Sequence, residues 1–190
     1  DASEDEAVIA SVKNAGNVIL PVYAVFSDDY AARKSIISAL EKPIQGLAEN
    51  AKIGHINTIP EKDGIIRKTP LYFDYSGENV SSFAWQVYSQ FLQYNGQTPN
   101  PDSIPLDAKK RMNIAYTGKP GDYGYLPYAD VLDGKVPPEY FQGKIVLIGP
   151  CTAGIQDYYF TPLARHKPMY GVEIHANIIQ NLMNQNFKRE

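Results

Sequence analysis

The stretch Gly143-Lys-Ile-Val-Leu-Ile-Gly149 decides the fold class of this chain. Its apolar residues follow one another without the alternation of a half-exposed strand, which is typical of a strand covered on both faces. We therefore predict a central strand over residues 144–149, with Ile145 and Leu147 in the core. Truncation of Leu147 to alanine would then cost about 2–5 kcal/mol of folding free energy through the cavity that it leaves.

Outward from this strand, helical and strand patterns alternate. Helices are predicted near residues 3–16, 82–95, 128–132 and 171–186, strands near residues 18–25, 53–57, 65–73 and 112–116, and loops over residues 97–107, 118–125 and 150–169. Residues 30–51 are ambiguous, with helical apolar spacing before an interrupting proline and a second short helix expected over residues 44–51. The alternation favours a single α/β domain, a layered domain with a mixed, mostly central sheet flanked by helices.

The composition limits the classes of function. The formal net charge is −3 with no long run of one sign, so a nucleic-acid partner is not expected. Cys151 is the only cysteine, so no internal disulfide can form. No apolar run approaches the ~18–20 residues of a membrane helix. Because the sequence starts at Asp1 without a methionine or signal peptide, we interpret it as a piece of a longer protein.

The residues after the predicted strand suggest two chemistries. Residues 149–154 have the length of a phosphate-binding loop, but Ile155 and Gln156 stand where such a loop needs Lys and Ser or Thr. Cys151 sits where a nucleophile elbow would place its nucleophile, and Asp157 and His175 follow in the order of a triad. A small cysteine hydrolase is therefore an alternative function. Cysteine is also a common small buried hydrophobe, and we expect Cys151 to be chemically idle.

Metal and cofactor sites are not indicated. His166, Glu173 and His175 have no spacing of a helical zinc motif, and no cofactor is predicted. His175 lies on the apolar stripe of the last predicted helix, which favours a buried, hydrogen-bonded histidine. Glu173 lies in the first turn of that helix, where a carboxylate complements the helix dipole.

An ordered series of short motifs resembles one family. The series contains Gly54-His-Ile-Asn57, Asp63-Gly-Ile-Ile-Arg67 with Pro70-Leu71, Asn113-Ile-Ala-Tyr116 with Gly118, Asp130-Val-Leu132 with Gly134, Gly143–Gly149, Gly154 with Asp157, Thr161-Pro162, and Gly171-Val-Glu-Ile-His-Ala-Asn177. In this order and spacing it resembles the CHASE-type extracellular sensor domains of the second class, from about Asp1 to Asn186. Such domains usually begin with further strand–helix units ahead of the segment that corresponds to Asp1, and the resemblance implies that those units are missing here. Either the fragment was trimmed or this member is short, and we expect the sheet to have an exposed edge, which invites pairing with another chain.

The resemblance implies an extracytoplasmic sensor domain of a bacterial membrane receptor. Its partners would be an unknown small-molecule ligand, covalently linked membrane helices and a cytoplasmic output domain, such as an adenylate cyclase or a histidine kinase; a homodimer is another expected partner. The domain itself would carry no catalytic residues. A purely structural dimerisation domain is a further alternative.

A ligand site is expected where the loop after the predicted strand meets the last helix, because concave sites of α/β sheets lie beyond the carboxyl ends of strands. The predicted ligand-binding residues are Gly149, Thr152, Gly154, Asp157, Tyr158, Thr161, Gly171 and Glu173. Glycines let the backbone approach closely there, and Glu173 favours a neutral or cationic ligand. The competing interpretation is that Asp157 and Thr161 only cap backbone groups.

Overall fold

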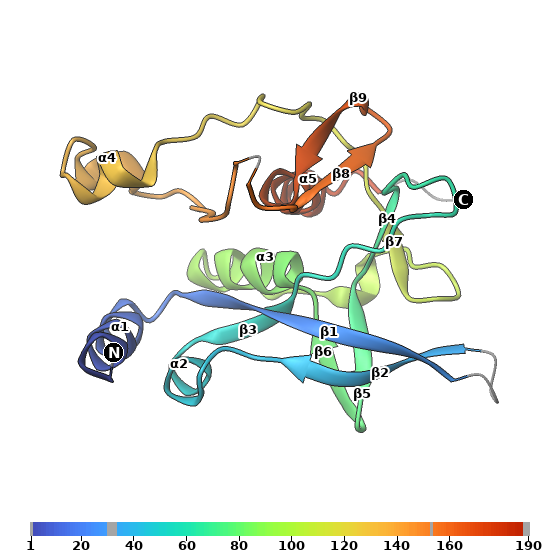
Figure 1. Cartoon of the computed structure of the whole chain (residues 1–190), viewed down its shortest axis with the longest axis horizontal. Coiled ribbons are helices and arrows are strands. Elements are labelled where there is room, and N and C mark those ends of the chain that lie inside the picture. The colour runs from blue at the N-terminus through green and yellow to red at the C-terminus, as the bar shows by residue number, and fades with distance from the viewer. Residues whose placement is uncertain (1, 30–33, 153, 188–190) are drawn as a thin grey trace.

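Strand β1 (Ile19–Asp29) organises the largest sheet of the protein, shown in Figure 1 as a computed structural model that describes residues 2–29, 34–152 and 154–187. It pairs antiparallel with β2 (Lys34–Glu41) and parallel with β3 (Lys52–His55), in the order β2-β1-β3. The predicted strands near residues 18–25 and 53–57 are therefore confirmed. Pro21 lies where β1 pairs with β3 alone, so a missing N–H donor is tolerated there.

Residues 34–41, left ambiguous by the sequence, form a strand, although Ile36, Ile37 and Leu40 have helical spacing. Pairing with β1 overrides this local pattern: Ile37 lies opposite Phe26, and Leu40 lies opposite Ala24. Part of the ambiguous region, residues 30–33, lies outside the described residues. The short helix expected next is confirmed as α2 (Gln45–Asn50).

The other elements form helices and three small antiparallel sheets. The helices are α1 (Ala2–Ala15), α3 (Phe83–Tyr94), α4 (Tyr128–Leu132) and α5 (Gly171–Asn184), with 3-10 turns at Pro101–Ser103 and Pro138–Phe141. The small sheets pair β4 (Lys68–Pro70) with β7 (Arg111–Asn113), β5 (Tyr72–Tyr75) with β6 (Glu78–Ser81), and β8 (Tyr158–Thr161) with β9 (Ala164–Tyr170). The α/β class is confirmed, with the strands divided among several sheets. The hairpin β8–β9 occupies residues predicted to be a loop.

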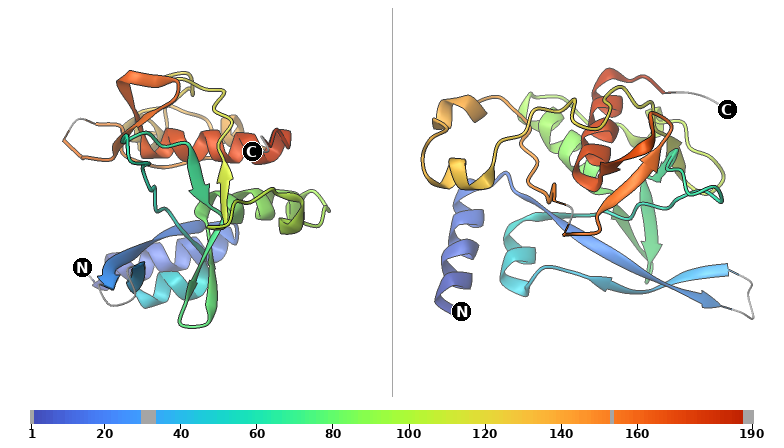
Figure 2. Two further views of the ribbon diagram at one scale, coloured as in Figure 1. Left: turned by 90° about the vertical axis from the view of Figure 1, so that its right-hand side faces the viewer. Right: turned by 45° about the horizontal axis from the view of Figure 1, so that its top comes forward.

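The core lies where α3 and α5 pack together. Helix α3 contacts β1 and β3 on one side and α5 on the other, as the views in Figures 1 and 2 agree. Ser82 caps α3 by accepting a hydrogen bond from the Trp85 N–H at 3.2 Å. The apolar stripes of the two helices, including Ala84 and Val87 on α3 and Ile174 and Leu182 on α5, are buried in one cluster.

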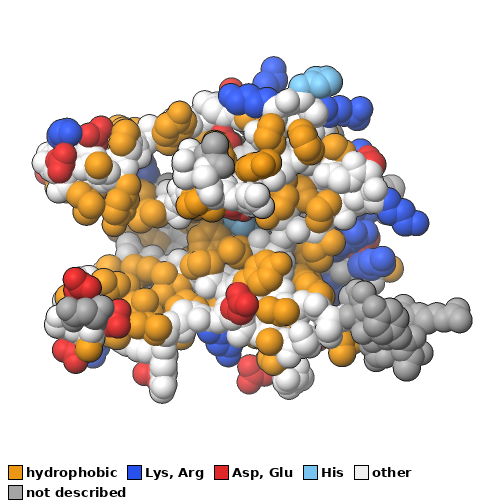
Figure 3. Space-filling model, viewed as in Figure 1, with side chains coloured by type: hydrophobic (Ala, Val, Ile, Leu, Met, Phe, Trp, Pro, Cys, Tyr) orange, Lys and Arg blue, Asp and Glu red, His pale blue; other side chains and the backbone are white. Residues whose placement is uncertain are grey.

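Residues 144–149 do not form the predicted central strand. Their alternate side chains face opposite ways: Ile145 and Leu147 pack on the core, whereas Val146 and Ile148 are 50% and 79% exposed. Within the described chain, no strand pairs with this segment and no backbone hydrogen bond reaches residues 145–148. The segment has the composition of a strand that is buried on both faces. Because no described strand lies beside it, the face that carries Val146 and Ile148 stays exposed. Figure 3 shows apolar side chains gathered on one face of the molecule, around a hollow between α4 and α1.

We predict that the largest cavity penalties lie on α5. Ile174 is fully buried, so Ile174→Ala should lower the free energy of unfolding by about 2–5 kcal/mol. Ile148→Ala, at an exposed position, should stay within about 0.5 kcal/mol of the wild type, and half-buried Leu147 should fall between them. Urea unfolding of the three variants measures this, and equal losses for Ile148→Ala and Ile174→Ala would contradict the described packing.

Candidate functional site

The loop after residue 149 meets the start of α5, as expected from the sequence. A Cβ atom on Gly171 would lie 2.5 Å from both carboxylate oxygens of Asp157, and the Gly171 N–H donates to the Asp157 main-chain oxygen at 3.0 Å. A Cβ atom on Gly149 would lie 2.7 Å from the Cβ of Val172. Both glycines therefore permit a close approach that a larger residue would block. We call the contact of residues 149, 157 and 171 the loop–helix junction.

Glu173 ties the start of α5 to the backbone. Its Oε1 accepts a hydrogen bond from the Gly121 N–H at 2.7 Å, and its Oε2 accepts one from the Tyr170 N–H at 3.1 Å. The second bond belongs to a capping box at the helix start. Glu173 is buried, and both carboxylate oxygens are engaged. This arrangement supports a structural role for Glu173.

The other predicted ligand-binding residues divide into an inner and an outer group. Asp157 is half-buried, and desolvation raises the pKa of its carboxyl although a hydrogen bond from Tyr159 opposes the shift. Thr161 is fully buried, and its Oγ1 has no partner in the structure. Thr152, Gly154 and Tyr158 are exposed. Ligand binding by the eight residues stays a prediction.

Two asparagines that anchor α5 were not among the site residues predicted from the sequence. The Asn177 side chain is fully buried. Its Oδ1 accepts from the N–H groups of Thr117 and Gly118 at 3.1 and 3.0 Å, and its Nδ2 donates to the Gly118 and Glu173 main-chain oxygens. Asn181 accepts from the Ala115 N–H at 2.9 Å.

Together with Glu173, these asparagines form a polar stripe at positions 173, 177 and 181, one helical turn apart. The stripe holds residues 115–121 against α5. Its spacing in the sequence was a usable signal, because buried amides satisfy backbone groups that form no sheet ladder.

His55 on β3 is buried, and His175 on α5 is half-buried. His55 is 1% exposed, neither of its ring nitrogens has a hydrogen-bond partner, and its ring lies 4.2 Å from that of Phe73. Desolvation, followed by the charge of His175, lowers the pKa of His55 to about 3. Desolvation also lowers the pKa of His175 to about 4, against a hydrogen bond to the Ile56 backbone. Both rings are therefore neutral at pH 7.

The surroundings of Cys151 oppose nucleophilic catalysis. The thiol is exposed in a loop that has neither a strand before it nor a helix after it, so the strand–turn–helix geometry of an elbow is not formed. Desolvation and the negative charges of Glu173 and Asp157 raise its pKa, whereas catalytic thiols need the opposite shift. Over the described residues, no group of three or more His, Cys, Asp or Glu side chains is placed to hold a metal ion.

Comparison with known proteins assigns the chain to a family. A family model for the CHASE2 domain matches residues 1–190, the whole length of the chain. The chain belongs to the CHASE2 family. CHASE2 domains are extracellular sensor domains of cyclases and kinases, so this chain is a sensor domain used in signal transduction. No curated protein and no solved structure matches it. In the part of this CHASE2 domain that the structure describes, no helix is long and apolar enough to span a membrane.

The motifs that carry the family resemblance are joined in space. The segments 113–118 and 171–177 are distant in sequence, and the side chain of Asn177 in one binds the backbone of Gly118 in the other. In this CHASE2 domain, some of the residues that carry the family resemblance therefore also hold the last helix in place.

We predict that Asn177→Ala destabilises the domain by about 2–5 kcal/mol. The substitution leaves the N–H of buried Gly118 and the partly buried N–H of Thr117 without an acceptor, and an unsatisfied buried donor costs about 1–3 kcal/mol. Asn184→Ala is the matched control on the exposed end of the same helix and should change the unfolding free energy by less than about 0.5 kcal/mol. Equal stabilities for the two variants would show that the polar stripe does not hold α5.

We predict that stability falls as the pH drops below about 6.5. In the unfolded chain both histidines become protonated near their ordinary pKa of ~6.5. In the folded state they stay neutral down to about pH 4 or below. Stability that is fully present above pH 6.5 is therefore lost at roughly 1–2 kcal/mol per pH unit from each histidine. Urea unfolding between pH 7 and pH 5 measures the slope.

His55→Leu should reduce this slope by about half, because it removes one of the two titrating groups. His166→Leu, at an exposed position, is the matched control for loss of a histidine. A stability that is flat between pH 7 and pH 5 in the wild type would contradict the burial of both rings.

Proposed function

We propose that this chain is the ligand-sensing input domain of a bacterial transmembrane receptor, placed on the outer side of the cytoplasmic membrane. In this proposal, membrane helices join it to a cytoplasmic output domain, a nucleotide cyclase such as an adenylate cyclase or a kinase such as a histidine kinase. The family match over residues 1–190 is the observation that carries the proposal, because CHASE2 domains are extracellular sensors of cyclases and kinases.

The transmitting element in this proposal is α5. Its first residue is held by Asp157, its polar stripe is held by residues 115–121, and its apolar stripe packs on α3. A ligand that favours one arrangement of these contacts would shift α5 by its difference in affinity between two arrangements. The loop–helix junction, with the predicted ligand-binding residues around it, is where such a shift would enter the helix.

A structural dimerisation domain is the second candidate. The exposed side chains of Val146 and Ile148 lie on an extended segment without a neighbouring strand, and such an edge favours pairing with a second copy. A dimer alone would connect two output domains without any ligand. The variants Val146→Lys and Ile148→Lys distinguish the two candidates. Only a dimerisation domain would lose its assembly, measured by sedimentation, together with its output.

We predict that Asp157→Asn in the intact receptor abolishes the response of the output to its stimulus and leaves the melting temperature of the domain within about 2 °C of the wild type. The amide keeps the size of the carboxylate but removes the charge beside Gly171. Asp74→Asn, an exposed position on β5, is the matched control and should respond normally.

Glu173→Gln should behave differently from Asp157→Asn. The Gln side chain replaces one of two engaged carboxylate oxygens by an N–H₂ group that faces a backbone donor, so its melting temperature should fall by several degrees. A large fall for Asp157→Asn as well would make the junction purely structural, and a normal response in Asp157→Asn would remove it from signalling.

A further inference from the structure

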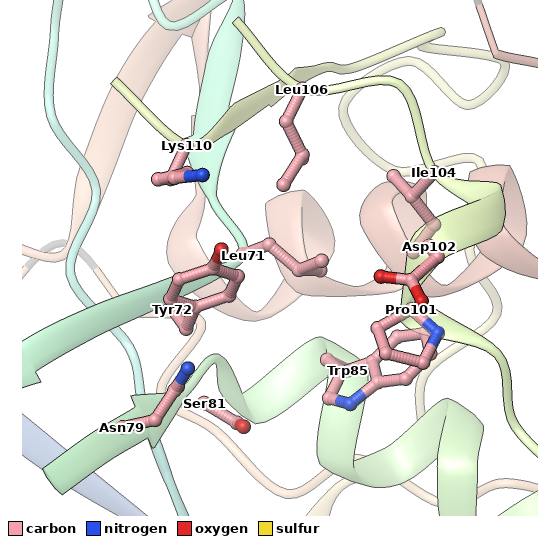
Figure 4. A pocket seen from close by; sticks show the side chains of 10 residues that line it. All are labelled: Leu71, Tyr72, Asn79, Ser81, Trp85, Pro101, Asp102, Ile104, Leu106 and Lys110. Atoms are coloured by element: carbon pink, nitrogen blue, oxygen red, sulfur yellow. The ribbon is translucent and has the colours of Figure 1, made fainter. Parts of the chain in front are cut away.

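A pocket of about 490 Å³ lies away from the loop–helix junction, between the β5–β6 hairpin, the first turn of α3 and the loop before β7. Figure 4 shows its walls, which come from residues 71–85 and from residues 101–110. Its apolar surfaces are the side chains of Leu71, Ile104 and Leu106 together with the indole of Trp85. Pockets that mix such surfaces with a few polar groups are typical of small-molecule sites.

The polar groups of the pocket are not used by the protein. Lys110 and Asp102 lie on opposite sides in Figure 4, and among the described residues neither side chain has a hydrogen bond or an ion pair. Over the same residues, the side chains of Asn79 and Ser81 have no hydrogen-bond partner either. By contrast, Asp107 nearby is engaged by Arg111 at 2.8 Å and by Lys68 at 3.3 Å.

The backbone at Lys110 is held in a conformation that favours glycine. Its φ is +59°, a left-handed conformation that is strained for a lysine. The Lys110 N–H donates to the Asp107 main-chain oxygen at 2.9 Å, and its main-chain oxygen accepts from the Leu71 N–H at 3.0 Å. These bonds fix the position from which the ammonium group reaches the pocket.

We propose that this pocket binds a small zwitterion, a molecule with an ammonium group and a carboxylate separated by a short apolar body. Lys110 would hold the carboxylate, with the amide of Asn79 as a further polar partner. Asp102 and the neighbouring ring of Trp85 would hold the cation by charge and by cation–π attraction. The apolar body would contact Leu71.

Two sources share this chemistry, a free amino acid and a quaternary betaine. Their volumes are well below that of the pocket, which leaves space for a side chain or for water. Opposite charges on opposite walls select against purely anionic or purely cationic molecules of similar size.

Helix α3 connects the pocket to α5. Trp85 belongs to α3, and α3 packs along α5. This step rests on the proposed function, because it takes α5 as the element that transmits the signal. Binding itself does not depend on that function and can be measured on the 190-residue chain.

The test is thermal melting of the chain with each of the twenty protein L-amino acids and with glycine betaine at millimolar concentration. At least one of these zwitterions should raise the melting temperature by several degrees. A shift by amino acids alone or by betaine alone identifies the source. If none of these probes changes the melting temperature, the proposal is overturned.

Variants of the two charged residues make the test specific. Lys110→Met and Asp102→Asn should each lose the shift and keep the melting temperature of the ligand-free chain, because neither side chain has a partner in it. Lys110→Arg should retain the shift. Lys109→Met and Asp74→Asn are matched controls outside the pocket and should behave as the wild type.

Derivatives of the stabilising zwitterion locate the two charges. For an amino acid, the N-acetyl form lacks the cation and the carboxamide lacks the anion, and both should lose the shift in the wild type. A shift that persists in Lys110→Met or Asp102→Asn would place the binding elsewhere and overturn the assignment of this pocket. A different outcome separates the two proposals. If the wild type shows the shift and both variants lose it, but the intact receptor does not respond to the same zwitterion, the binding site stands and the proposed sensing function is contradicted.

Discussion

The structure depends on one buried amide. Asn177 on α5 satisfies the N–H groups of Thr117 and Gly118, which belong to an irregular segment without a sheet partner. Buried backbone groups cannot be left unpaired at low cost, so the helix stabilises this segment by supplying acceptors for its N–H groups. Glu173 and Asn181 extend the same support along the helix. The position of α5 against the core is thus fixed by polar bonds as well as by its apolar stripe.

This arrangement suits a sensor domain. An apolar contact between helices tolerates small sliding motions, whereas a hydrogen-bonded stripe has discrete satisfied arrangements. The first residue of α5 is tied to Asp157, and α5 packs on α3, the helix that carries Trp85 of the pocket. In the proposed function, a ligand at either place would act on α5.

The sequence predicted the parts of the fold that depend on local patterns. Ser82 and the apolar stripe after it gave α3, and Gly171 marked the start of α5. The prediction failed where distant pairing decides. Ile36 and Ile37 form a strand because β1 lies beside them, and residues 144–149 stay unpaired because no strand does. The meeting of the 149–157 loop with the start of α5 was expected from the rule that sites lie beyond the carboxyl ends of strands, whereas the pocket around Lys110 joins residues 71–85 with residues 101–110 and gave no local signal.

Amide hydrogen exchange at Thr117 and Gly118 tests the central role of the polar stripe most directly. These two N–H groups lie outside helices and strands, so they would exchange at loop rates if Asn177 did not bind them. The account predicts protection comparable to that of the α5 amides in the core, through the same opening reaction. Exchange of both amides at the rate of the exposed residues Gly124 and Tyr125, with α5 still protected, would contradict it.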